Sequence, residues 1–284
     1  MNLEAAISLP ILNPQVARDY LSVSLAGKET IAPLPRVCAQ LAELTAQQAT
    51  DAAQLAKLIQ SDPVLAGELM RVANSPALRP RSAIVSLQQA VSWLGVAEVR
   101  NIAMAVMLRG EVFTAPGHEP ESEELWREAW LAGLWAKEIA RERRKHVESA
   151  FLAALMHRTG AALALKVLSR FEREQRTVMD AHTFGELVVE FEPAFGRLLM
   201  GNWSLPMDVQ DAASDWRNYR DSSHSDLAGT VHAAHLFATH TMHPQLLDEE
   251  VVIESLVFEQ LGMFPDDRRK MLAKRDQVRT LAGL

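Results

Sequence analysis

The sequence has little of the chemistry that most readily identifies a protein. Cys38 is the only cysteine among 284 residues, so an internal disulfide is impossible and a cysteine-based zinc site is excluded. The N-terminus lacks a basic leader, and its short apolar run is broken by Pro10, which argues against a signal peptide. No uninterrupted apolar run approaches the ~20 residues that cross a bilayer. We therefore expect a cytoplasmic protein that makes no membrane contact of its own.

The motifs of common enzymes are also missing. The chain has no glycine-rich phosphate loop, no G-x-S-x-G elbow and no H-E-x-x-H helix. The net charge is -7, and acidic residues outnumber basic residues by 28 to 20 over residues 111–284. An acidic surface repels phosphates, so we expect no nucleic-acid partner.

Apolar residues recur at spacings of three and four along almost the whole chain, which predicts an all-α fold. Residues 110–122 interrupt this pattern with two glycines and two prolines. We place a linker at 111–122, between an N-terminal helical subdomain at 1–110 and a C-terminal one at 123–284. The expected helices lie near residues 14–26, 34–45, 52–60, 63–73, 87–94, 97–109, 123–144, 147–157, 161–172, 174–181, 194–202, 206–218, 226–242, 248–261 and 266–282.

The segment from Lys57 to Arg100 is the most informative part of the chain. Asp62 and Pro63 form a helix start, because a carboxylate can cap free amides and proline tolerates the first helical position. The sequence Asn74-Ser75-Pro76 ends that helix, because the residue before a proline avoids the α conformation. The pattern predicts a sharp corner between helices.

A second pair of helices follows this corner. Ser86 and Gln89 have the spacing of a capping box, and Gly95 is placed to adopt the left-handed conformation at a helix end. The helix, glycine, helix order is that of a DNA-binding helix-turn-helix. However, the second helix carries apolar residues such as Val99 and Ile102 where a recognition helix needs polar ones, so it is predicted to be core.

The order of these features resembles the HDOD family of bacterial signalling modules, which are relatives of the HD phosphohydrolases. The resemblance extends from about Ala32 to beyond Pro206, and it implies an HD-like multi-helix fold with two helical subdomains. It rests on the features above and on Leu34-Pro35-Arg36-Val37, Leu41, the segment Arg71-Val72-Ala73-Asn74-Ser75, Ala90, Leu94-Gly95, Val99-Arg100, Leu125-Trp126, the stretch Phe151 to His157, Gly196 and Trp203-Ser204-Leu205-Pro206.

The resemblance also implies where a metal site would lie. In metal-dependent HD relatives an apolar helix ends in a His-Asp pair that binds a divalent metal, and the matching pair here is His157-Arg158. Arginine stays charged and offers no lone pair, so it would repel a cation. Glu128, Glu192 and Asp215 fall near other ligand positions of the relatives, but isolated carboxylates do not restore the set. We therefore expect no metal, no cofactor and no enzymatic activity.

Two interpretations of the histidines remain open. His157 is either a helix-end histidine bonded to backbone, or it forms with Arg158 an anion pocket for a nucleotide phosphate or a partner carboxylate. A separate group could converge along one helix and bind a metal, although no acidic or sulfur ligand accompanies it. This group consists of His232, His235, His240 and His243.

We expect a regulatory module that acts through protein–protein interaction with signalling proteins. One alternative is a sensor of a nucleotide second messenger, such as a cyclic dinucleotide, in the degenerate HD cleft. Another is residual metal-dependent phosphohydrolase activity. The corner residues also have structural explanations, namely capping, turn formation and a tie to a neighbour. The candidate ligand- or partner-binding residues are Asp62, Arg71, Asn74, Ser75, Arg100, His157 and Arg158.

Overall fold

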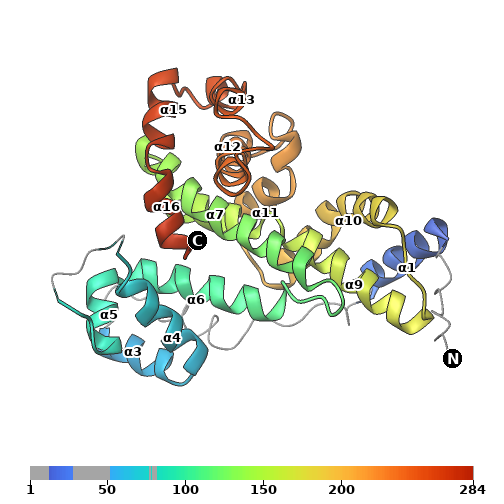
Figure 1. The fold of residues 1–284 in the computed structure, drawn as a ribbon, viewed down its shortest axis with the longest axis horizontal. Coiled ribbons are helices and arrows are strands. Elements are labelled where there is room, and N and C mark those ends of the chain that lie inside the picture. The colour runs from blue at the N-terminus through green and yellow to red at the C-terminus, as the bar shows by residue number, and fades with distance from the viewer. Residues whose placement is uncertain (1–12, 28–51, 77, 79–81, 284) are drawn as a thin grey trace, which may run out of the picture.

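The computed structural model describes residues 13–27, 52–76, 78 and 82–283. Within these residues the elements are helices and none is a β-strand, which confirms the all-α prediction (Figure 1). The helix expected at 34–45, with the family motif that begins at Leu34, lies outside the described residues, as does Cys38.

Three helices and half of a fourth form the smaller of two apolar cores. They are α3 (Ala52–Gln60), α4 (Pro63–Ala73), α5 (Leu87–Leu94) and the first part of α6 (Val96–Glu111). Their buried faces meet in a small cluster that includes Leu55, Ile59, Leu65, Leu69, Val91, Val99 and Ile102. We call this the small core.

The corner that follows α4 is fixed by its polar residues, as the sequence predicted. Asp62 Oδ1 accepts from the amides of Val64 and Leu65 at 2.9 and 3.0 Å and so caps the helix. Asn74 bonds both backbone groups of Ile84 at 2.9 Å, which ties the end of α4 to the chain before α5.

The turn between α5 and α6 differs in detail from the prediction. Ser86 Oγ caps the amide of Gln89 at 3.2 Å, but Gln89 Oε1 reaches back to the amide of Val85 rather than to that of Ser86. Gly95 has φ 81° as expected, yet its ψ of 158° is extended and not left-handed helical. This conformation bends α5 and α6 by 112°.

Five helices form most of the larger core. They are α7 (Glu119–Glu142), α8 (Val147–Met156), α9 (Thr159–Gln175), α10 (Ala181–Asn202) and α12 (Ser225–Met242). Helix α7 packs against α8 and α12, and α9 packs along α10. Their side chains bury Trp135, Phe151, Phe195 and Phe237 almost completely in what we call the large core.

Shorter helices cover the end of this core beyond α12. Helix α12 contacts several of them, and the last helix lies against α7. They are α11 (Met207–Ser214), the 3-10 turn η2 (Trp216–Asn218), α13 (Glu249–Ile253), α14 (Val257–Gln260), α15 (Pro265–Leu272) and α16 (Arg275–Ala282).

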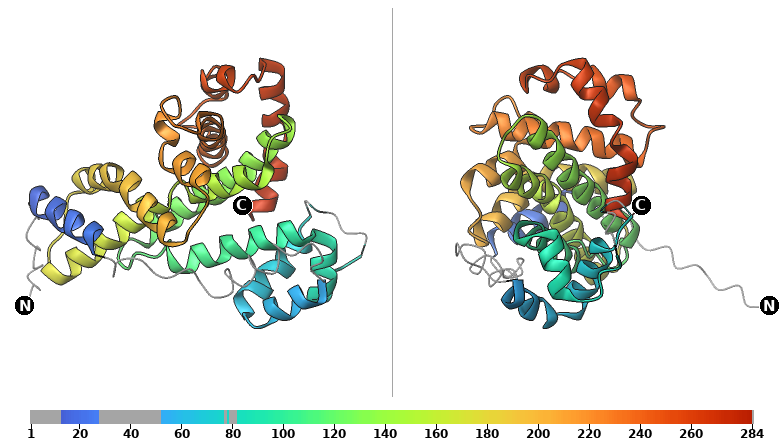
Figure 2. Two further views of the ribbon diagram at one scale, coloured as in Figure 1. Left: turned by 180° about the vertical axis from the view of Figure 1, so that it is seen from behind. Right: turned by 90° about the vertical axis from the view of Figure 1, so that its left-hand side faces the viewer.

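The first helix belongs to the large core although it precedes the small core in sequence. Helix α1 (Pro14–Ala26) packs against α9 and α10, and Figure 2 shows it at the other end of the molecule from α3, α4 and α5. Helix α6 contributes to both cores, because Val99 and Ile102 lie in the small core while Ala105 and Leu108 lie in the large core. The division at residues 111–122 stays a prediction.

Several helix boundaries were predicted wrongly. Helix α7 begins at Glu119 rather than 123, and the regions 248–261 and 266–282 each hold two short helices rather than one long helix. No helix spans 174–181, because α9 ends at Gln175 and Arg176 adopts a left-handed conformation with φ 50°. Helix α10 then begins at Ala181 and continues through Pro193, where the sequence predicted a helix only from 194.

One helical stretch, Val147–Gln175, is long and apolar enough to span a bilayer by length and composition alone. It comprises α8 and α9, and 89% of its most apolar window is buried inside the molecule. That burial is what a core helix of a folded protein shows.

Candidate functional site

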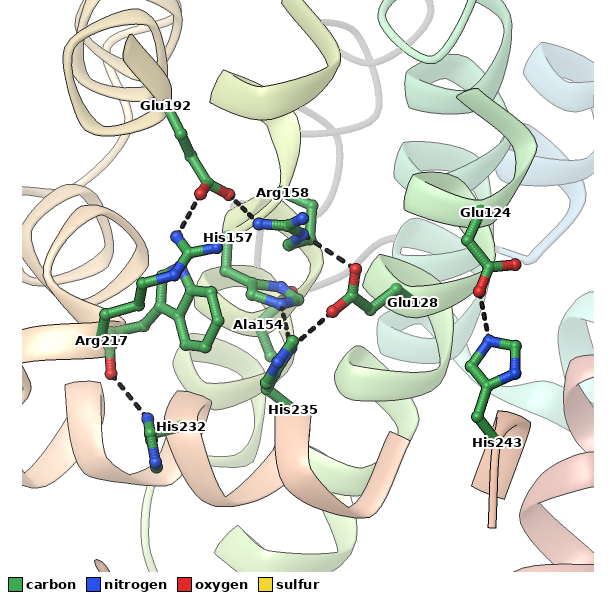
Figure 3. Close-up of polar contacts among 11 residues, drawn as sticks. Glu124, Glu128, Ala154, His157, Arg158, Glu192, Arg217, His232, His235 and His243 are labelled. Atoms are coloured by element: carbon green, nitrogen blue, oxygen red, sulfur yellow. Dashed lines mark hydrogen bonds and ion pairs between the residues drawn. The ribbon is translucent and has the colours of Figure 1, made fainter. Parts of the chain in front are cut away.

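The helices of the large core bring charged and aromatic side chains together at the end of α8. Glu128 comes from α7, His157 and Arg158 from the junction of α8 and α9, and Glu192 from α10. His235 comes from α12 (Figure 3). We call these five residues, together with Arg217 of η2, the Arg158 cluster.

A glycine allows this convergence. Gly160 lies in the first turn of α9, where the helix crosses α10 so closely that a Cβ on residue 160 would lie 1.9 Å from the Glu192 carbonyl oxygen. Only a residue without a side chain fits there. The close crossing places the Glu192 side chain beside Arg158.

Arg158 is the centre of a buried ion-pair network. Its Nε lies 2.9 Å from Glu128 Oε2, and its Nη1 pairs with Glu192 Oε1. The other oxygen of Glu192 pairs with Arg217, whose guanidinium stacks on Trp216 at 4.1 Å. The side chains of Arg158, Glu128 and Glu192 are 11%, 15% and 3% exposed, so water screens these pairs weakly.

The ion pair between Glu128 and Arg158 keeps both groups charged. Burial by itself raises the pKa of Glu128, but the neighbouring Arg158 and the hydrogen bond from His235 outweigh it and hold that pKa well below its usual range. Burial by itself lowers the pKa of Arg158, but Glu128 and Glu192 raise it by more. The charges of Glu128 and Arg158 therefore stabilise each other.

His157 is held neutral beside this network. It is 2% exposed, and its Nδ1 lies 2.5 Å from the Ala154 carbonyl oxygen. Because a carbonyl only accepts, Nδ1 carries the proton, and Nε2 lies 3.2 Å from His235 Nδ1. Burial, and then the proximity of His235, lower the pKa of His157 well below its usual value.

Three atoms of the cluster approach the geometry of a metal site. Ligand atoms of Glu128, His157 and His235 all lie within 4.8 Å of one another. However, Arg158 already pairs with the Glu128 carboxylate, and His235 Nδ1 lies 2.8 Å from that carboxylate and uses its proton there. The Arg158 guanidinium next to these ligand atoms would repel a divalent cation.

Arg158 is also not free to form an anion pocket with His157. Both Nε and Nη1 contact carboxylates, and His157 is buried and uncharged. A phosphate bound here would be repelled by the carboxylates of Glu128 and Glu192, which already pair with Arg158. The structure therefore supports the interpretation of His157 as a helix-end histidine bonded to backbone.

The structure does not bring the four histidines of the group at 232–243 together, so it does not support the alternative in which they bind a metal. His232 Nδ1 lies 3.1 Å from the Trp216 carbonyl, and His240 Nδ1 lies 2.7 Å from the Leu247 carbonyl. His243 follows the end of the helix and pairs with Glu124. Only His235 faces the Arg158 cluster.

The corner residues lie away from this cluster and have structural contacts of their own. Asp62 and Asn74 cap and tie α4 as described, and Arg71 pairs with Glu68 at 2.8 Å while remaining about half exposed. Ser75 is buried, and its Oγ has no hydrogen-bond partner in the described part of the chain.

Arg100 has a different role from the corner residues. It pairs with Glu148 at 2.5 Å and so connects α6 to α8. A second ion pair, between Lys137 of α7 and Glu98 of α6, makes a similar connection close by. These pairs hold the small core against the large core.

Sequence reasoning did not predict that Arg217 joins the cluster or that Trp216 packs beside it. Both lie in η2, a short turn with no motif, and they reach Glu192 and His157 across 25 and 59 positions of sequence. The one signal in the chain is that they follow Asp215, which falls near a ligand position of the metal-dependent relatives.

The fold is all-helical over the described residues, and an arginine follows the buried histidine at the end of core helix α8. The HDOD domain family matches residues 31–218, well over half of the chain, and the chain belongs to this family. The resemblance seen in the sequence is thereby confirmed.

Solved structures share the fold over most of the chain. A "Putative metal-dependent phosphohydrolase" from Shewanella amazonensis SB2B is 18% identical, with a TM-score of 0.72, and the match covers 95% of this chain and 99% of that one. An HDOD domain protein of unknown function from Geobacter sulfurreducens is 16% identical, with a TM-score of 0.69 and coverage of 95% and 99%.

A "Putative signal transduction protein" from Marinobacter aquaeolei VT8 is 21% identical, with a TM-score of 0.65, and the match covers 98% of this chain and 68% of that one. No curated protein matches the sequence. At these identities the likeness is one of fold, and activity has to be argued from the side chains.

Proposed function

We propose that this chain is a bacterial signal-transduction module that acts by binding a protein partner and has no catalytic activity. The observation that carries the proposal is the guanidinium of Arg158, which bridges Glu128 and Glu192 where an HD phosphohydrolase would use a metal ligand. Membership of the HDOD family supports a signalling role.

The physical reason is that a guanidinium cannot activate water as a bound metal ion does. A bound divalent ion lowers the pKa of its water and creates a nucleophile near neutral pH. The Arg158 guanidinium is not a Lewis acid, so it cannot bind a water molecule and lower its pKa as a metal ion does. It also pairs with the two carboxylates that would attract a metal ion. The network stabilises the fold of the cleft and leaves it without an activated nucleophile.

The surface most suited to a protein partner lies on the small core beside α5. Trp93 is 49% exposed and lines a hollow of about 670 Å³, and Val85, in the same stretch of chain, is 76% exposed. Serine and glutamine side chains, including Gln88 and Gln89, line the same hollow. An exposed tryptophan with polar neighbours is typical of an interface anchor, so the partner should insert an apolar side chain among hydrogen-bonding groups.

Crosslinked capture from the source cell tests this surface with three proteins: wild type, Trp93→Glu, and the matched control Val178→Glu. Val178 is also 49% exposed but lies between α9 and α10, at the other end of the molecule. We expect Trp93→Glu to lose a partner that wild type and the control retain, and that partner to bind purified wild type. If both variants retain the same partners, the choice of surface is wrong.

A metal-dependent phosphohydrolase is the second candidate, because Glu128, His157 and His235 present converging ligand atoms. Metal analysis of protein purified without chelator, together with hydrolysis assays in Mn²⁺, Co²⁺ or Zn²⁺, distinguishes the two functions. Stoichiometric metal with turnover that His157→Ala abolishes would replace the binding proposal. Wild type without metal or turnover supports it.

A further inference from the structure

A cavity of about 640 Å³ lies between the small core and the large core, away from the Arg158 cluster. Its walls come from α4, α6, α7 and α16 and from the connection at 113–116. The volume falls within the roughly 300–1,000 Å³ of small-molecule sites. No residue of the Arg158 cluster lines it.

Aromatic rings form one wall of the cavity. The rings of Trp126 and Trp130 are stacked, with centroids 6.0 Å and planes 9° apart. Phe113 meets Trp126 at 5.6 Å in an edge arrangement. All three are less than 10% exposed and line the cavity, so one of its walls is aromatic.

A buried hydroxyl group without a partner lies in the same wall. Ser122, in the first turn of α7, is 3% exposed and lines the cavity. Its Oγ has no hydrogen-bond partner among the residues that the structure describes. Because buried polar groups in folded proteins are nearly always paired, this hydroxyl points to a polar atom supplied from outside the chain.

The charges around the cavity exclude an anionic occupant. Arg71 pairs with Glu68 at 2.8 Å, and Arg109 pairs with Glu123 at 3.2 Å. Glu119 also lines the cavity, so three carboxylates face two guanidinium groups. The rim attracts no negative charge, which distinguishes this cavity from a nucleotide site.

We propose that this cavity binds an uncharged, flat, ring-containing small molecule that stacks along Trp126 and Trp130 and hydrogen-bonds to Ser122 Oγ. Such a ligand touches α4 and α6 on one side and α7 on the other, so it contacts both cores at once. The inference is independent of the partner surface at Trp93, and failure of one leaves the other standing.

Two pyrene derivatives test the proposal with purified full-length protein: neutral 1-pyrenemethanol and anionic 1-pyrenecarboxylate. Pyrene emission reports transfer to an apolar site, and its dependence on protein concentration gives the Kd. We expect saturable 1:1 binding of the neutral compound, with the anion at least tenfold weaker. Absence of saturable binding, or preference for the anion, would overturn the proposal.

Substitutions locate the binding. Val106→Trp and Ala105→Phe add bulk at positions that line the cavity, and we expect either to abolish binding of 1-pyrenemethanol. Ser122→Ala should weaken binding about fivefold, which corresponds to one ordinary hydrogen bond. The control Ser22→Ala, at an exposed serine of α1, should leave the Kd unchanged.

Circular dichroism and thermal unfolding establish which variants fold. If the buried substitution Ala105→Phe does not fold, Val106→Trp at a half-buried position and Ser122→Ala decide the question. Folded cavity variants that bind 1-pyrenemethanol as tightly as wild type would overturn the assignment of the site.

Discussion

Replacing Arg158 with methionine should destabilise the protein by about 3–5 kcal/mol at pH 7, the usual cost of breaking a buried ion pair from one side. Methionine retains much of the length and apolar surface of the arginine side chain, so the change removes mainly the charge and the hydrogen bonds. Glu128 then keeps only His235 as a partner, and Glu192 keeps only Arg217. Both carboxylates remain 15% exposed or less, so the protein cannot compensate by solvating them.

The loss should depend on pH in a defined direction. In wild type the pKa of Glu128 is lowered by folding, so its stabilisation is present above the unfolded value of about 4.3 and is lost as pH falls below that value. In the variant the stranded carboxyl has a folded pKa above the unfolded one, so its penalty is largest at high pH and disappears as the group is protonated. The difference between the two proteins should therefore shrink from pH 7 to about pH 4.5.

Urea unfolding followed by circular dichroism at several pH values measures this difference. The control Arg18→Met removes an exposed ion pair of 2.8 Å between Arg18 and Glu190 and should cost less than about 1 kcal/mol. The double variant Arg158→Met, Glu128→Gln should recover part of the loss, because it no longer buries an unpaired charge. A loss below about 1 kcal/mol for Arg158→Met, or one that does not change with pH, would refute the reasoning.

Three further predictions concern the same helices. Gly160→Ala should lower the free energy of unfolding by at least about 1–3 kcal/mol, because its Cβ would overlap the α10 backbone. The control Gly185→Ala, in open space on an exposed part of α10, should stabilise the protein slightly in the same urea titration, and equal effects of the two changes would contradict the close crossing. Burial of His232 lowers its pKa to about 4, so its imidazole proton signals in NMR should titrate near that pH, and a midpoint near 6.5 would show that the ring is exposed. Calorimetry with a cyclic dinucleotide should show no binding heat at the Arg158 cluster, and a saturable signal lost in Arg158→Met would show that the guanidinium does accept an anion.

Local features of the fold could be predicted because their physics is local. Asp62 before Pro63 and Ser86 before Gln89 cap helices through contacts within four residues, and the structure contains both caps. The errors at 174–202 arose from two residues whose backbone conformations differ from the usual preferences of their residue types. Arg176 is a left-handed residue that is not glycine, and Pro193 lies inside a helix that tertiary packing maintains.

The candidate site could be predicted only as separate residues. The sequence singled out Glu128, Arg158 and Glu192 as departures from a metal site, but it could not show that the three side chains pair with one another. Those contacts span 30 and 34 positions and depend on how α7, α9 and α10 cross. The cavity beside Trp126 was not predictable either, since a stripe of tryptophans on a helix is normally filled by a neighbouring helix.

Because helix α6 belongs to both cores, we expect the two cores to unfold together. Its 16 residues extend for roughly 24 Å at about 1.5 Å per residue, with Val99 in one core and Leu108 in the other. Neither core can melt without removing a wall of its neighbour, so the free energy that a partner contributes on the small core also opposes opening of the large core. Binding of a partner to the small core should therefore slow hydrogen exchange of amides in the large core, with no change in the average structure.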